Sequence, residues 1–138
     1  MTTTIESQCL EAKKTTDSLL QLSTEEKNNI LTDMADCLIK QSNIIIAENN
    51  KDIEAGKANG LSQSLIDRLA LNEDRIKGIA ESLIIIKNLN DPIHTIIDEW
   101  TRPNNLSIQK VRVPFGVIGI IYEARPNVTV DAIGLAIK

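Results

Sequence analysis

The sequence predicts an α/β protein in which N-terminal helices precede a β-hairpin and a single strand–helix step of a doubly wound sheet. Three observations favour this class. Apolar residues recur with a helical period over much of residues 1–90. Residues 91–114 then contain two extended runs on either side of a turn. Residues 115–122 are apolar on both faces, which is typical of a strand buried in a parallel sheet, and a helical pattern follows them up to residue 138.

Four helices are expected before residue 91. The first covers residues 5–22, and the second runs from residue 24 to residues 49–56. The last three helices each follow a residue whose side-chain oxygen can cap a first turn, namely Ser23, Ser62 and Asn72. The Asn59-Gly60 pair separates the second helix from the third. Pro92 ends the fourth, because proline disfavours helical conformation in the residue before it.

The hairpin is expected to consist of strands at residues 93–100 and 106–113, joined by a turn at residues 102–105. Apolar residues of the second strand change parity partway along it, and a bulge near Gln109-Lys110 would repair the alternation. An exposed hairpin edge can pair with another chain. The hairpin is therefore a candidate contact between copies of the protein.

Composition excludes several classes of function. The net charge is −4 and the aromatic content 2%, so the chain offers neither a basic surface nor stacking platforms for nucleic acid. The first residues do not resemble a secretory signal, and no apolar run approaches membrane-spanning length, so we expect a cytoplasmic protein without membrane contact. Cys9, Cys37 and His94 are too few for a Cys/His zinc site, and no metal site is expected.

The candidate site lies between the apolar strand and the last helix. Ligands of open α/β sheets bind at the carboxyl ends of strands, and the free N–H groups of a helix N-terminus attract anions. Pro126 suits the first helical turn. Arg125 can hold a phosphate or carboxylate bidentately, or it can pair with Glu123 or Asp131. Asn127 can donate to an oxyanion, or it can cap the turn.

The string from Tyr122 to Asp131, Tyr-Glu-Ala-Arg-Pro-Asn-Val-Thr-Val-Asp, resembles the γ-glutamyl phosphate reductase family, a branch of the aldehyde dehydrogenase superfamily. The strings at residues 58–62 and 67–71 match the same family. The resemblance covers essentially the whole chain and implies an aldehyde-dehydrogenase-like, Rossmann-type cofactor domain. Family members are much longer. Residues 1–138 are therefore expected to be a truncated, incomplete N-terminal part of the NADPH-binding domain.

The resemblance also implies a reaction. Family members convert γ-glutamyl phosphate to glutamate 5-semialdehyde and phosphate with NADPH, in proline biosynthesis, and a cysteine thiolate displaces the phosphate. That cysteine is expected beyond Lys138, so we expect structural roles for Cys9 and Cys37, no catalytic residue in this chain and no activity from it alone. A homo-oligomer through residues 93–113 and functional coupling to glutamate 5-kinase are further expectations.

The position between a strand and a helix N-terminus makes Glu123, Ala124, Arg125, Pro126 and Asn127 the expected cofactor-binding residues of this chain. Among these, Arg125 and Asn127 are also candidate contacts to the substrate or its oxyanion. The resemblance implies that most of the groups that hold NADPH lie beyond Lys138. Ungapped alignment with the wider superfamily puts Arg125, not Asn127, at the superfamily's asparagine, so the oxyanion donor stays open between them. Two other functions compete with the reductase: an assembly module without catalysis, and a different aldehyde dehydrogenase.

Overall fold

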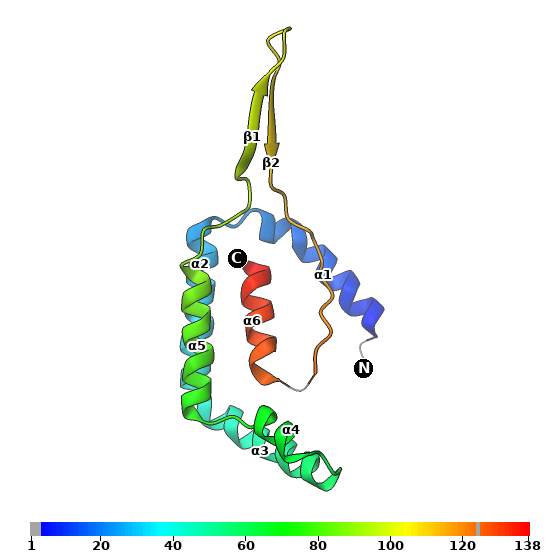
Figure 1. Ribbon diagram of the computed structural model, residues 1–138, viewed down its shortest axis with the longest axis vertical. Helices are drawn as coiled ribbons and strands as arrows, with labels where there is room; N and C mark the ends of the chain where they lie inside the picture. Colours follow the sequence, from blue (N-terminus) through cyan, green and yellow to red (C-terminus); the bar gives the residue numbers. More distant parts are fainter. Residues whose placement is uncertain (1–3, 124) are drawn as a thin grey trace. The chain divides into compact units, whose positions relative to one another are not determined.

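The computed structural model describes residues 4–123 and 125–138, which form six helices and a two-stranded sheet (Figure 1). The chain divides into two compact units. We call residues 1–24 and 90–119 the first unit, and residues 25–89 and 120–138 the second unit. The predicted order, helices and then a hairpin and then a last helix, is confirmed.

The first unit contains α1 (Ile5–Leu20), which agrees with the helix expected at residues 5–22. Thr4 caps this helix, because its Oγ1 accepts a hydrogen bond of 3.2 Å from the backbone N–H of Ser7. No residue of α1 is buried. Local capping therefore stabilises α1, and the helix contributes no buried residue to a core of the first unit.

The hairpin of the first unit consists of β1 (Ile96–Thr101) and β2 (Ser107–Val111), which pair antiparallel. Its turn is closed by hydrogen bonds of 2.9 Å, from Arg102 N–H to the Leu106 carbonyl and from Asn105 N–H to the Arg102 carbonyl. The bulge was predicted in the wrong strand. Ile97 of β1 is the extra residue, and it lies between the pairs Ile96–Val111 and Asp98–Lys110.

The second unit contains the remaining helices: α2 (Thr24–Lys40), α3 (Ser42–Ala58), α4 (Gln63–Leu69), α5 (Glu73–Lys87) and α6 (Pro126–Ile137). The single long helix predicted from residue 24 to residues 49–56 is wrong. Gln41, with φ −102° and ψ 11°, interrupts it and separates α2 from α3. No glycine or proline marks this break in the sequence. Helix α2 packs on α5 through the buried cluster, whereas α3 packs mainly on α4, and this difference in packing partners accounts for the break.

The predicted caps of the shorter helices are confirmed. Ser62 Oγ accepts a hydrogen bond from Leu65 N–H at 3.4 Å, and Asn72 Oδ1 accepts one from Arg75 N–H at 2.8 Å. Gly60 adopts φ +75° after α3, a conformation that glycine reaches without strain. Helix α2 begins directly after Ser23, where a cap was expected.

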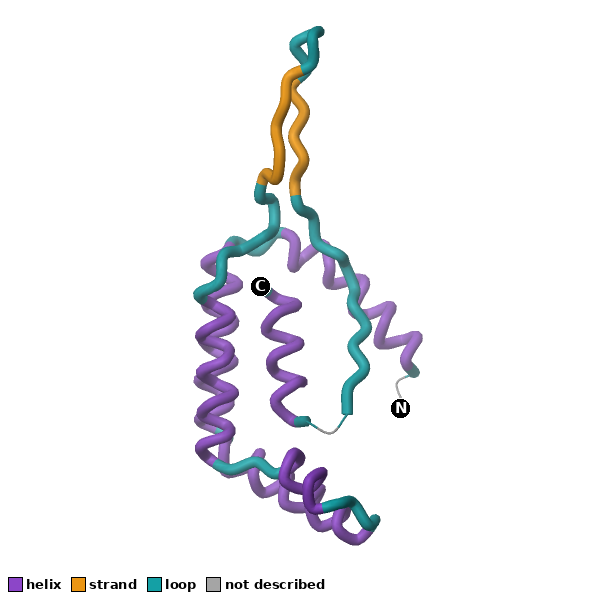
Figure 2. Tube along the Cα trace, in the orientation of Figure 1, coloured by secondary structure: helices purple, strands orange, loops and turns teal. Residues whose placement is uncertain are grey.

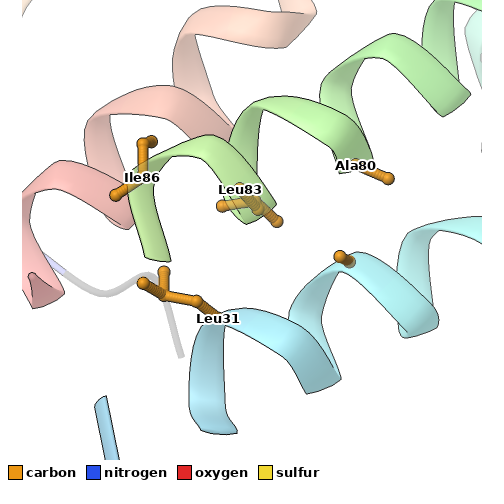
Figure 3. Close-up of a cluster of buried hydrophobic side chains, with 5 residues drawn as sticks. Leu31, Ala80, Leu83 and Ile86 are labelled. Carbon is orange, nitrogen blue, oxygen red and sulfur yellow. The ribbon is translucent and has the colours of Figure 1, made fainter. Parts of the chain in front are cut away.

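The core of the second unit lies between α2, α5 and α6. Leu31 of α2 and Leu83 of α5 are fully buried against each other's helices, and Ala80 and Ile86 extend the cluster (Figure 3). Val130 of α6 packs against the same cluster. These residues remove aliphatic surface from water, which stabilises the unit by about 25 cal/mol for each Å² of apolar area buried.

Gly134 lets α6 approach this core closely. A Cβ atom at position 134 would lie 2.8 Å from Leu83 Cδ2 and 3.1 Å from Ile86 Cδ1, which is closer than side chains normally allow. Near the end of the same helix, Lys138 is buried. Its Nζ donates to Asn28 Oδ1 at 2.6 Å and to the Lys87 carbonyl at 2.8 Å. Helix α6 is thus fixed to both α2 and α5.

The parallel strand predicted at residues 115–122 is not formed. These residues are loop in Figure 2, and no strand of the described residues pairs with them. Phe115 and Ile121 are exposed at 96% and 102%. A β-strand needs a neighbouring strand for its backbone hydrogen bonds, and the hairpin strands pair only with each other. The segment therefore has the apolar composition of a buried strand, but no sheet of the described residues includes it.

Candidate functional site

The candidate site lies in the second unit, at the start of α6. Arg125 is the N-cap residue, with extended backbone at φ −129° and ψ 101°, and Pro126 occupies the first helical turn as predicted. The Arg125 carbonyl accepts a hydrogen bond of 3.1 Å from Val128 N–H. The Arg125 side chain makes no capping hydrogen bond. The helix N-terminus is therefore formed by the backbone, and the guanidinium is not used to cap it.

The guanidinium of Arg125 is exposed and makes no hydrogen bond or ion pair with any described residue. Neither Glu123 nor Asp131, the two structural partners considered from the sequence, pairs with it. Backbone contact does link the site residues, because Arg125 N–H donates to the Glu123 carbonyl at 2.6 Å. Ala124, the fifth expected cofactor residue, lies outside the described residues.

Asn127 lies inside α6 and is not its cap. Its Nδ2 donates to Asp131 Oδ2 at 3.3 Å, one helical turn further on. The Tyr122 hydroxyl and Thr129 Oγ1 are 2.5 Å apart, and this hydrogen bond ties the segment before the site to α6. The amide of Asn127 has a second N–H, which can still donate to a ligand.

An open cleft of about 670 Å³ extends from these residues to α4 and α5. We call it the arginine cleft, because Arg68, Arg75 and Arg125 all line it. Its other lining residues are polar or small for the most part: Ser64, Asp67, Ala70, Leu71, Gly78, Ile79, Ser82, Pro126 and Asn127. Arg68 and Arg75 were not expected as site residues. The string at residues 67–71 was noted only as a match to the family, and it contains Arg68.

The corner between α4 and α5, which forms one wall of the cleft, is held by two side chains. Arg75 Nη1 donates at 2.5 Å to the carbonyls of Asp67 and Ala70, which lie at the C-terminal end of α4. Asn49 is buried, and its amide bonds the Leu69 carbonyl at 3.0 Å and the Leu71 N–H at 2.7 Å. The backbone of this wall is therefore fixed independently of any ligand.

Arg125 also lines a second open cleft, of about 500 Å³. Residues of α3, including Ile44 and Ile45, line it together with Tyr122 and Thr129. Its lining is more apolar than that of the arginine cleft. Arg125 and Pro126 line both clefts, so the N-terminus of α6 borders a space of mixed polarity and a more apolar one.

The remaining candidate residues lie apart from this site. Cys9 and Cys37 are exposed free thiols on α1 and α2. His94 precedes β1 in a turn with φ +62°, where residues 93–95 had been predicted as strand. Within residues 4–123 and 125–138 no group of three His, Cys, Asp or Glu side chains has the spacing to hold a metal ion. None of the described helices is long and apolar enough to cross a membrane.

Curated proteins and solved structures that resemble the chain are γ-glutamyl phosphate reductases. No family model matches the chain. The chain is 53% identical over 126 residues to the γ-glutamyl phosphate reductase of Anoxybacillus flavithermus, which covers 91% of this chain and 30% of that protein. It is 56% identical over 121 residues to the corresponding reductase of a Geobacillus species, which covers 88% of this chain and 29% of the relative.

Two crystal structures of γ-glutamyl phosphate reductases resemble the fold. The structure from Thermotoga maritima has a TM-score of 0.93 and 39% identity, and the match covers 96% of this chain and 32% of that one. The structure from Saccharomyces cerevisiae has a TM-score of 0.89 and 27% identity over 97% of this chain and 34% of that one. The chain thus spans about a third of the length of its relatives and is homologous to their N-terminal portion.

Proposed function

We propose that this chain is the N-terminal portion of a γ-glutamyl phosphate reductase, and that the complete protein converts γ-glutamyl phosphate to glutamate 5-semialdehyde and phosphate with NADPH, in proline biosynthesis. The observation that carries the proposal is the identity of 53–56% to such reductases over about nine-tenths of the chain. The cytoplasm is the location that suits this reaction. The catalytic thiolate would come from a part of the complete protein that follows Lys138.

The residues at the start of α6 fit an anionic ligand such as part of NADPH. Arg125 offers a guanidinium that no described residue neutralises, and it stands at the positive end of a helix dipole. Asn127 keeps one amide N–H for a ligand. When bound, NADPH supplies the hydride. Glu123, Ala124, Arg125, Pro126 and Asn127 would position its anionic part or the oxyanion of the substrate.

Association of the complete protein is a second part of the proposal. The hairpin exposes apolar side chains, including Ile97 at 51% and Trp100 at 41%. Single exposed apolar residues are ordinary, but a hairpin with free edges and several of them suits contact with a second copy. Functional coupling to glutamate 5-kinase, which supplies the acyl phosphate, belongs to the same proposal.

Substitution of Arg125 in the complete protein tests the site. Losing a charge-assisted hydrogen bond costs about 1.5–3 kcal/mol, so Arg125→Ala should lower kcat/KM roughly ten- to hundredfold. Arg125→Lys should recover only part of this, because a point charge does not replace a bidentate fork. The assay is NADPH formation from glutamate 5-semialdehyde, phosphate and NADP⁺, the reverse direction.

Lys77→Gln is the matched control, because Lys77 is an exposed cation of α5 that lines neither cleft. It should leave kcat/KM unchanged. If Arg125→Ala lowers the melting temperature sharply while the folded enzyme keeps its kcat/KM, Arg125 is a structural residue. If the unaltered complete protein forms no NADPH, the proposed reaction is wrong.

A further inference from the structure

The arginine cleft concentrates positive charge in an acidic protein. Three of the five arginines of the chain line it, although the net charge of the chain is −4. Asp67 is the one carboxylate among the lining residues, so the cleft carries three guanidinium groups against one carboxylate. Clefts with an excess of one charge attract small ions of the opposite charge. This distribution points to an anionic ligand.

The three arginines do not have equal roles. The Arg75 guanidinium already donates hydrogen bonds to the backbone carbonyls of Asp67 and Ala70. Arg68 and Arg125 make no side-chain hydrogen bond or ion pair within the described part of the chain. The Asp67 carboxylate does not neutralise Arg68 either. Its Oδ1 accepts a hydrogen bond of 2.9 Å from Gln63 Nε2. Two guanidinium groups, that of Arg68 in α4 and that of Arg125 at the N-cap of α6, therefore remain available to a ligand.

Arg68 is carried by a well-anchored segment. Its neighbour Ile66 is 5% exposed, and the backbone that follows is fixed by Asn49 and Arg75. Because the wall that carries Arg68 is already in place, little backbone order has to be gained when a ligand binds. The cleft volume of about 670 Å³ is also within the range of small-molecule sites, roughly 300–1,000 Å³.

We propose that Arg68 is a substrate-specificity residue that, together with Arg125, holds an oxyanion of the small-molecule substrate in the arginine cleft. The inference rests on the proposed reductase function. It adds Arg68 of α4 to the residues that contact the substrate. Carboxylate and phosphate groups share the geometry that a guanidinium fork binds. Either the carboxylate of the amino-acid part or the phosphate can be the bound group, and kinetics with separate substrates distinguish them.

The test compares Arg68→Gln, Arg68→Lys and the control Lys77→Gln in the complete protein. KM is measured separately for glutamate 5-semialdehyde, phosphate and NADP⁺ in the reverse reaction. Arg68→Gln should raise one KM about ten- to hundredfold while kcat changes much less, because the lost contact is made in the ground state as well. A rise in KM for the semialdehyde assigns the carboxylate, and a rise in KM for phosphate assigns the phosphate.

Arg68→Lys keeps the charge and the fold and should give an intermediate KM. Unchanged KM values for both oxyanion substrates in folded Arg68→Gln overturn the inference. A rise in KM for NADP⁺ alone also overturns it, because the cleft would then hold the cofactor.

A measurement without turnover separates this inference from the proposed reaction. Inorganic phosphate or L-glutamate should raise the melting temperature of the unaltered complete protein by binding its folded state, and Arg68→Gln should abolish that rise. If the protein is inactive as a reductase but shows this loss, the anion site stands and the reaction is wrong. If neither compound stabilises the unaltered protein, the anion site is wrong, whatever the activity.

Discussion

The two units of this chain are stabilised in different ways. In the second unit, aliphatic side chains of three helices are removed from water, and Leu31 and Leu83 are fully buried. In the described part of the first unit, residues 4–24 and 90–119, no residue is buried. Its helix and hairpin are held by caps, turns and strand pairing. Substitutions should therefore change the free energy of unfolding mainly in the second unit.

The largest effect is expected from Leu83→Ala in α5. Truncating a fully buried leucine removes apolar contacts and leaves a cavity, which costs about 2–5 kcal/mol of unfolding free energy. Urea denaturation followed by circular dichroism measures it. Leu10→Ala in α1 is the matched control and should cost far less, because Leu10 is 55% exposed. Equal losses for the two substitutions would contradict the contrast between the units.

Two glycines of the second unit should respond in opposite directions to the same change. Gly134→Ala places a Cβ against Leu83 and Ile86, and overpacking of this kind costs about 1–3 kcal/mol, of which about 1 kcal/mol is regained from helix propensity. Gly78→Ala meets nothing within 4 Å and should stabilise the protein by about 0.5–1 kcal/mol. Thermal melts of both variants are the measurement. Stabilisation by Gly134→Ala would show that α6 packs less closely than described.

The smallest effect on unfolding is expected in the hairpin. Trp100→Ser should change the free energy of unfolding by less than about 0.5 kcal/mol, because Trp100 is 41% exposed and contributes to no core. The same substitution should weaken association of the complete protein, as measured by analytical ultracentrifugation, if the hairpin is a contact between copies. Thr101→Ser is the control. An unchanged sedimentation profile for Trp100→Ser would remove the hairpin from the proposed interface.

Local signals predicted the helices well. Ser62 and Asn72 accept the hydrogen bonds expected of caps, and Pro126 opens α6, because these features depend on residues a few positions apart. The break at Gln41 could not be predicted, because it depends on which helices α2 and α3 pack against. The strand expected at residues 115–122 needs backbone partners, and an apolar pattern does not reveal whether those partners are present.

The site shows the same division. Arg125 and Asn127 could be found from the strand–turn–helix pattern, since a helix N-terminus is a local feature. Arg68 and Arg75 were missed because they lie on other helices about fifty residues earlier, and periodicity does not tell which helices pack together. The sequence left open whether the Arg125 guanidinium pairs with Glu123 or Asp131. Among the described residues it pairs with neither.

The hydrogen bond between Lys138 and Asn28 joins residues 110 positions apart. Contacts of such high contact order slow folding, because the entropy of closing a long loop is lost before the contact is gained. During synthesis, α2 and α5 emerge from the ribosome before α6, because the hairpin is made between α5 and α6. The apolar surface that α2 and α5 share is covered by α6 only after the hairpin has been made. During that interval the parts of Leu31 and Leu83 that face Gly134 of α6 stay uncovered, and a chaperone would then protect this apolar surface from aggregation.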